Sequence, residues 1–285
     1  MSRRGFALLA VLWLVTALTV LAGVTLAVAR TGSETTRNRM LLARAGWARE
    51  ACVEILLARY AQSPTVRRLD RVDLGRGTWC DAVLDDPGAK LNLNVADRDA
   101  LLALLLAAGA RPGALDSLAD ALLDWRDADT IPRPDGLETP GNRNGPLADV
   151  AELGEVRGFD AALVAHLSSF VTTRGTGAIN VNAAPAPVLR TLPGMSDEAL
   201  RVVLGGRASE STLQSTDELA ALLSKSARAV LFAQYPEFVR AVTFGPAQLV
   251  AVVRGGVTAT PTVARATLTL VPVPGRLVVI RRETE

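Results

Sequence analysis

The sequence has very little histidine and cysteine, and this scarcity excludes several kinds of chemistry. His166 is the only histidine among 285 residues, so a site built from several histidines is excluded and a Ser-His-Asp triad has one candidate base. Cys52 and Cys80 are the only cysteines, too few for a tetrahedral zinc site or a disulfide-rich scaffold. Two alternatives stay open for them: one disulfide, or buried free thiols. No nucleophile motif accompanies His166, so we predict that the protein is not an enzyme.

The chain also lacks an excess of charge of either sign. It has 31 basic and 29 acidic residues, and Arg3 and Arg4 account for the net charge of +2. The rest of the chain has equal numbers of basic and acidic residues, so it lacks the excess of positive charge that is typical of nucleic-acid-binding proteins. Hydrophobic residues nevertheless make up 49% of the sequence, and the mean hydropathy of +0.25 is high for a fully soluble protein. Apolar residues must therefore be concentrated in one segment.

That segment is residues 6–29, a run without a single charge. As a helix rising about 1.5 Å per residue it would be long enough to cross a bilayer core of roughly 30 Å. Arg3 and Arg4 precede it, and basic residues that flank a span tend to stay in the cytoplasm. We therefore predict a single-pass membrane protein whose body lies on the opposite side.

Three interpretations compete for this first segment: a secretory signal, a plain anchor, or a pilin-type leader. The run is longer than the 7 to 15 residues of a secretory signal, although residues 27–29 form an A-x-A site. The junction Arg3-Arg4-Gly5-Phe6 resembles the leader of type IV prepilins and pseudopilins. That resemblance implies cleavage after Gly5 and methylation of Phe6 by a membrane peptidase. It also places Ala10 where most members have a glutamate that pairs with a neighbouring subunit. The absence of this glutamate implies a subunit at the tip of the fibre, where no further subunit lies ahead of it.

The apolar pattern continues at steps of three and four residues as far as Tyr60, and Ser63-Pro64 predicts the end of the helix. Short alternating strands are predicted at 72–74, 78–84, 248–253, 263–271 and 276–280, with Gly255-Gly256 between two of them. About 140 residues rich in alanine and leucine separate the two groups of strands. The prediction is an α+β, type IV pilin-like fold, with a long N-terminal helix on a small antiparallel sheet and a large inserted all-helical domain. The expected parts are a leader (1–5), a transmembrane and assembly helix (6–62), the first strands (63–92), the insertion (93–236) and the last strands (237–285).

The insertion repeats itself. Residues 91–96 read Leu-Asn-Leu-Asn-Val-Ala and residues 179–184 read Ile-Asn-Val-Asn-Ala-Ala, and each copy precedes a helical pattern. We expect these asparagines to cap the helices. The turns at 157–160 and 193–196 resemble helix-hairpin-helix modules without their second glycine. The alternative function is therefore a membrane-anchored DNA-binding protein of the competence type.

Acidic residues cluster in one stretch interrupted by Pro132, Pro134 and Gly136. Clustered carboxylates in a turning loop suit a hard cation such as calcium, although the spacing is not that of an EF-hand. The alternative is a solvated face neutralised by Arg126 and Arg133. The candidate ligands are Asp124, Asp127, Asp129, Asp135 and Glu138.

The chain resembles the minor pseudopilin K family of the type II, or general, secretion system. The resemblance is carried by residues 123–129, 136–138, 144–147 and 152–158, by the block 179–185, and by Leu192-Pro193-Gly194. It implies a subunit at the tip of a periplasmic pseudopilus, anchored in the bacterial inner membrane, that initiates or caps a fibre exporting folded proteins across the outer membrane. The implied partners are other minor pseudopilins in a tip complex, the major pseudopilin, the prepilin peptidase, the inner-membrane secretion platform and inner-membrane lipid, and no nucleic acid.

Overall fold

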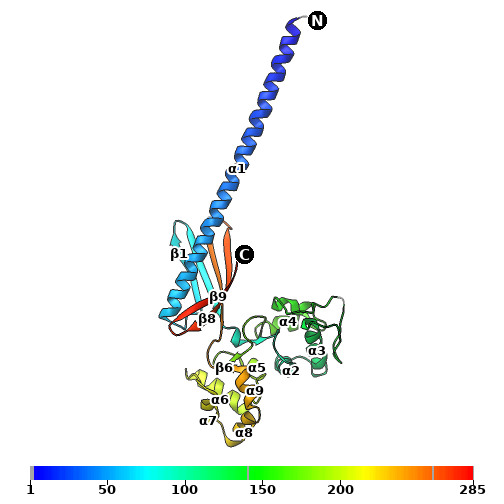
Figure 1. The fold of residues 1–285 in the computed structure, drawn as a ribbon, viewed down its shortest axis with the longest axis vertical. Helices are drawn as coiled ribbons and strands as arrows, with labels where there is room; N and C mark the ends of the chain where they lie inside the picture. The colour runs from blue at the N-terminus through cyan, green and yellow to red at the C-terminus, as the bar shows by residue number, and fades with distance from the viewer. Residues whose placement is uncertain (1–2, 140, 259, 285) are drawn as a thin grey trace.

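The computed structural model describes residues 3–139, 141–258 and 260–284. Its longest element is α1 (Arg3–Gln62), one helix of 60 residues that begins before Phe6 and ends directly before Ser63-Pro64. The residues described between 11 and 40 are all exposed, and this part of α1, here called the stem, projects away from the rest of the molecule (Figure 1). Within the described residues, Val11–Gln62 is long and apolar enough to cross a membrane.

Five strands form an antiparallel sheet in the order β1-β2-β7-β8-β9. Their bounds are β1 (Arg68–Gly75), β2 (Thr78–Asp85), β7 (Leu249–Val257), β8 (Val263–Val273) and β9 (Arg276–Thr284). The tight turn between β1 and β2 is Gly75-Arg76-Gly77, and all three residues have positive φ. The predicted fold class, a long helix on a small antiparallel sheet, is confirmed.

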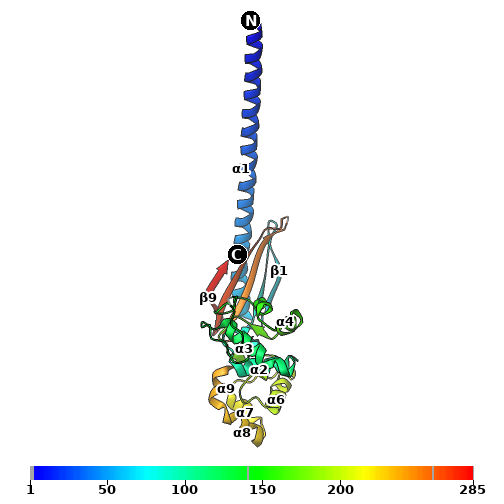
Figure 2. The ribbon, with the colours of Figure 1, turned by 90° about the vertical axis from the view of Figure 1, so that its right-hand side faces the viewer.

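The last part of α1 covers one face of this sheet (Figure 2). Cys52 and Leu56 of α1 pack with alternate residues of the strands, among them Cys80, Ala251 and Leu268, because alternate side chains of a strand point to the same face. These residues form a hydrophobic core, here called the sheet core. It is separate from the core of the insertion.

Gly255 and Gly256 lie inside β7, so the expectation that they separate two strands is wrong. A Cβ on Gly255 would lie 2.1 Å from the backbone nitrogen of Arg49 in α1. A Cβ on Gly256 would lie 2.5 Å from the ring of Trp79 on the other face. The pair interrupts the apolar pattern of the strand because α1 and a tryptophan press directly against its backbone.

The insertion leaves the sheet after β2 and returns at β7, at neighbouring points, since Asp85 pairs with Val250. β2 ends at Asp85 and β7 begins at Leu249, and the insertion expected from the sequence, 93–236, lies between these points. It forms two lobes at the end of the molecule opposite the N-terminus (Figures 1 and 2). Polar contacts tie them to the sheet: Lys90 pairs with Asp85 at the end of β2 at 3.3 Å, and Arg174 pairs with Glu283 of β9 at 3.3 Å. Asn180 also donates to the buried Asp86, which directly follows β2, at 2.7 Å.

Each lobe consists of short helices closed by a parallel pairing of two residues, which the sequence did not reveal. Lobe 1, which follows η1 (Pro87–Ala89), contains β3 (Leu91–Asn92), α2 (Arg98–Ala107), η2 (Pro112–Ala114), α3 (Leu115–Arg126), η3 (Val150–Glu155), α4 (Ala161–Leu167) and β4 (Val171–Thr172). Lobe 2 contains β5 (Ile179–Asn180), α5 (Ala186–Leu189), α6 (Asp197–Ala208), α7 (Thr216–Ala221), α8 (Lys225–Ala233), α9 (Tyr235–Ala241) and β6 (Val242–Thr243). One continuous hydrophobic core runs through both lobes.

The repeated asparagines hold these lobes together, but they do not cap helices as expected. In lobe 1, Asn94 donates to the carbonyls of Leu147 and Thr173 and accepts from the amide of Leu147 at 2.8 Å. Its oxygen lies too far before α2 to cap that helix, and Asp97 caps it instead. Asn94 therefore ties three distant segments of lobe 1 together.

Asn182 makes the same set of bonds in lobe 2. It donates to the carbonyls of Leu213 and Phe244 at 2.7 Å each, and it accepts from the amide of Leu213 at 3.0 Å. A half-buried arginine accompanies each asparagine: Arg126 donates to carbonyls of the first repeat, and Arg207 to those of the second. The sequence repeat is thus a structural duplication.

Candidate functional site

The acidic stretch lies in lobe 1, where α3 ends and a long loop leads to η3. Asp124 is fully buried, and both of its oxygens accept from the backbone amide of Arg133 at 3.2 Å. Gly136 packs so closely that a Cβ there would lie 1.9 Å from Asp124 Oδ2. Burial raises the pKa of Asp124. Asp124 therefore shapes the loop, because its oxygens are already committed to the backbone.

Two other predicted ligands have local roles. Asp129 accepts from the backbone amide of Ile131 at 2.8 Å, as in an Asx turn. Asp135 is exposed, and its backbone amide lies 3.4 Å from a carboxylate oxygen of Asp120. The geometry favours neither as a ligand.

Three oxygen atoms of this loop are buried without a hydrogen-bond partner among the described residues: Asp127 Oδ1, Glu138 Oε1 and Asn144 Oδ1. The second oxygen of Asp127 lies 3.3 Å from Arg133, and that of Glu138 accepts from Asn142 at 3.0 Å. Buried acceptors without donors are rare, and a cation is one way to satisfy them. Burial and the neighbouring carboxylates raise the pKa of Glu138, as expected in an electronegative loop.

Asn144 was not among the residues predicted for this site. Its backbone is left-handed at φ 48°, its amide donates to the carbonyl of Trp125 at 3.0 Å, and its side-chain nitrogen donates to the carbonyl of Asp129 at 3.0 Å. These bonds fix the orientation of the side chain and leave its oxygen without a partner. The Asn-Gly sequence at this point was the available signal, because asparagine tolerates this conformation.

The described residues contain no group of three histidine, cysteine, aspartate or glutamate side chains close enough to hold a metal on their own. The five predicted carboxylates therefore do not form a complete metal-binding site by themselves. Since Asn144 contributes an amide oxygen, the arrangement is a mixed set of acceptors. The calcium site stays a prediction.

The two turns that resemble helix-hairpin-helix modules are packed against other helices. A Cβ on Gly158 would lie 2.9 Å from the side chain of Leu118, and one on Gly194 would lie 3.2 Å from the backbone of Leu231 in α8. Asp160 and Ser196, which follow these glycines, cap α4 and α6. Both turns serve the packing of the lobes, and this geometry does not favour a surface for DNA phosphates.

Two family models match most of the insertion. Both describe protein K of the type II secretion system, and they cover residues 83–176 and 179–235, together more than half of the chain. The chain belongs to this family. Its members are structural pseudopilins and not known enzymes.

Known relatives of this chain agree with the assignment. Type II secretion system protein K of Dickeya chrysanthemi is 37% identical over 101 residues, which span 31% of this chain and 28% of that protein. A chain in the crystal structure of the GspK-GspI-GspJ complex from the enterotoxigenic Escherichia coli type 2 secretion system matches with a TM-score of 0.64 and 17% identity. That match covers 88% of this chain and 99% of the other, and it shows that the fold is shared.

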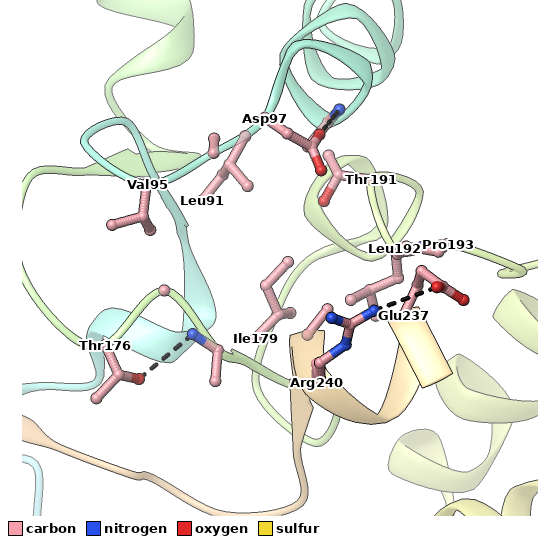
Figure 3. A pocket seen from close by; sticks show the side chains of 15 residues that line it. Leu91, Val95, Asp97, Thr176, Ile179, Thr191, Leu192, Pro193, Glu237 and Arg240 are labelled. Carbon is pink, nitrogen blue, oxygen red and sulfur yellow. Dashed lines mark hydrogen bonds and ion pairs between the residues drawn. The ribbon is translucent and has the colours of Figure 1, made fainter. Parts of the chain in front are cut away.

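The two lobes meet at a groove of about 600 Å³ (Figure 3). Leu91, Ile179 and Leu192 provide apolar lining, and at one side Arg240 pairs with Glu237 at 3.2 Å. His166 lies elsewhere, exposed on α4, where its ring meets Phe170 edge-on with centroids 5.6 Å apart. The position of His166 favours a packing role over that of a catalytic base.

The remaining predicted sites lie on α1 and β2. Gly5 and Phe6 belong to the first turns of α1. Cys52 and Cys80 are both free and buried, and their thiols interact with each other. The structure thus brings the two cysteines together, while cleavage after Gly5 stays a prediction.

Proposed function

We propose that this chain is the minor pseudopilin at the tip of the type II secretion pseudopilus, where it initiates or caps a fibre that exports folded proteins across the outer membrane. The observation that carries this proposal is the position of the two lobes at the end opposite the stem (Figure 1). In a stack of parallel stems, such a broad head has room only where no further subunit follows. The alanine at position 10, in place of a glutamate, supports the same position.

The proposal includes the surroundings of the protein. The stem lies in the bacterial inner membrane and the body lies in the periplasm, an orientation supported by Arg3 and Arg4 before the apolar run. The partners are other minor pseudopilins, the major pseudopilin, the prepilin peptidase, the inner-membrane platform and lipid. Because the role is mechanical, it requires no catalytic residue.

Processing by the prepilin peptidase gives the first test. The Gly5→Leu variant should remain an unprocessed precursor and abolish secretion, because a bulky side chain blocks the cleavage site. The mature mass, measured by mass spectrometry of the membrane-extracted protein, decides the result. Gly23→Leu, in the same apolar run, is the control and should be processed. Normal processing of Gly5→Leu would argue against the pilin-type leader.

The position in the fibre gives an independent test. Antibody-gold labelling of the body on pseudopili should mark one end of each fibre only. Labels spaced along the fibre would show that the lobes do not confine the subunit to the tip.

We also propose that the loop of lobe 1 holds a structural calcium ion, with Asp127, Glu138 and Asn144 supplying oxygen ligands. The support is the set of buried oxygens without partners in an electronegative loop. Calcium in excess of its dissociation constant by about 100-fold should then stabilise the protein by roughly 2.7 kcal/mol, seen as a higher melting temperature that a chelator reverses.

The paired variant Asp127→Asn with Glu138→Gln should lose this calcium response. Asp99→Asn, an exposed carboxylate of the same lobe, is the control and should keep it. Identical melting curves of the unsubstituted protein with and without calcium would remove the calcium proposal and leave the pseudopilin proposal intact.

A further inference from the structure

Cys52 and Cys80 lie on two different elements, α1 and β2, which the chain connects through the end of α1 and strand β1. Cys52 lies on α1 and Cys80 on β2, 28 positions later in the sequence. Both side chains are completely buried in the sheet core, and the two thiols are close enough to influence each other's pKa. The only two cysteines of the chain therefore meet where the assembly helix contacts the sheet.

The surroundings of this pair disfavour other cysteine chemistry. Burial raises the pKa of both thiols, and the nearby Asp81 raises them further. The thiolate, which is the nucleophile and the metal ligand, is thus disfavoured. The two thiols also have no access to solvent, so neither a substrate-binding nor a metal-binding role fits them. Because the chain has only these two cysteines, each thiol has the other as its only possible disulfide partner within the chain.

We propose that Cys52 and Cys80 form a disulfide that staples α1 to the sheet, and that the bond forms while the body folds in the oxidising periplasm. The compartment is taken from the proposed function. The two thiols lose two protons and two electrons as the sulfur–sulfur bond forms. The electrons pass to the disulfide of a periplasmic thiol oxidase, which becomes a dithiol.

The timing follows from burial. Thiol–disulfide exchange requires a thiolate and access of the partner sulfur. Neither condition holds once α1 covers the sheet, so the bond must form before the sheet core closes and is afterwards protected from reductants. The staple then carries force between the stem and the body through a covalent bond.

The direct test uses the full-length protein extracted from membranes. It is unfolded in denaturant with a thiol-alkylating reagent, and its mass is measured with and without prior reduction. The disulfide predicts no added label without reduction and two labels after it. Two labels without reduction would overturn the proposal. Processing after Gly5, visible in the same spectrum, reports on the pseudopilin proposal separately.

The second test separates a disulfide from simple packing of two thiols. Cys52→Ala, Cys80→Ala and the double variant should each lower the melting temperature by about 10 °C, because either single change removes the whole bond. Packed free thiols would instead give small decreases in melting temperature for the single variants, and the double variant would show their sum. That result would contradict the disulfide. The unsubstituted protein made in a host without periplasmic thiol oxidase should melt like the variants.

Discussion

At the scale of the residue, the half-buried arginines Arg126 and Arg207 show which contacts the sequence could not predict. The Asn-x-Asn repeat is visible by inspection, and the duplicated lobes follow from it. The arginines that bind it are not visible, because Arg126 and Arg207 lie 23 to 33 positions away from the carbonyls they contact, and each meets its own repeat only after folding. The sequence suggested that Arg126 neutralises nearby carboxylates. It donates to backbone carbonyls instead.

Replacing the half-buried arginine of lobe 2 tests this arrangement. Arg207 donates to the carbonyl of Ala184 at 2.6 Å and to that of Val181, and burial lowers its pKa. Arg207→Met should lower the free energy of unfolding by roughly 3 kcal/mol, because buried carbonyls lose a charged donor. Chemical denaturation of the full chain in detergent measures the loss.

The control is Arg201→Met, which removes the same charge from an exposed position of the same helix, α6. Its stability should change by less than about 0.5 kcal/mol. Equal effects of both variants would mean that the bonds of Arg207 add nothing to the lobe.

At the scale of the element, local periodicity was a good guide to helices and strands and a poor guide to their contacts. The long helix and all five strands of the sheet were predicted, since each has a pattern of its own. The position of Gly255-Gly256 was misjudged, because it depends on the contacts that α1 and Trp79 make with the strand. The first strand is also longer than the expected 72–74, since β1 spans Arg68–Gly75. Such contacts join segments between 177 and 210 positions apart in the sequence, and a pattern within β7 cannot reveal them.

The contact between α1 and β7 gives the prediction at this scale. In Gly255→Ala the new Cβ would lie 2.1 Å from a backbone nitrogen of α1 and 2.5 Å from the carbonyl oxygen of Ala45, so the helix must move away from the sheet. Overpacking of this kind should lower the free energy of unfolding by about 3 kcal/mol. The measurement is the unfolding of the membrane-extracted full chain.

Gly245→Ala is the matched control, because nothing lies within 4 Å of its would-be Cβ. It should leave the melting temperature nearly unchanged. A Gly255→Ala protein as stable as this control would contradict the close contact between α1 and the backbone of β7.

At the scale of the whole molecule, the two parts are separable because their cores do not share residues. The sheet core involves α1 and the strands, while the other core lies within the lobes. Asp85 pairs with Val250, so the insertion starts and ends at neighbouring points. The sequence indicated an insertion from the change of pattern, but the adjacency of β2 and β7 depends on a pairing across more than 160 residues. Periodicity carries no information on that pairing.

This separation predicts that each part folds without the other. Replacing residues 87–248 by Asn-Gly, a sequence suited to a two-residue hairpin, should join β2 directly to β7 and preserve α1 on the sheet. The excised fragment 87–248 should fold as a soluble helical unit with its own cooperative melt, because it contains the entire lobe core. Circular dichroism and calorimetry of both products measure this outcome. An unfolded fragment, or a shortened chain without its strands, would show that the links through Asp86 and Arg174 are indispensable and that the molecule is one folding unit.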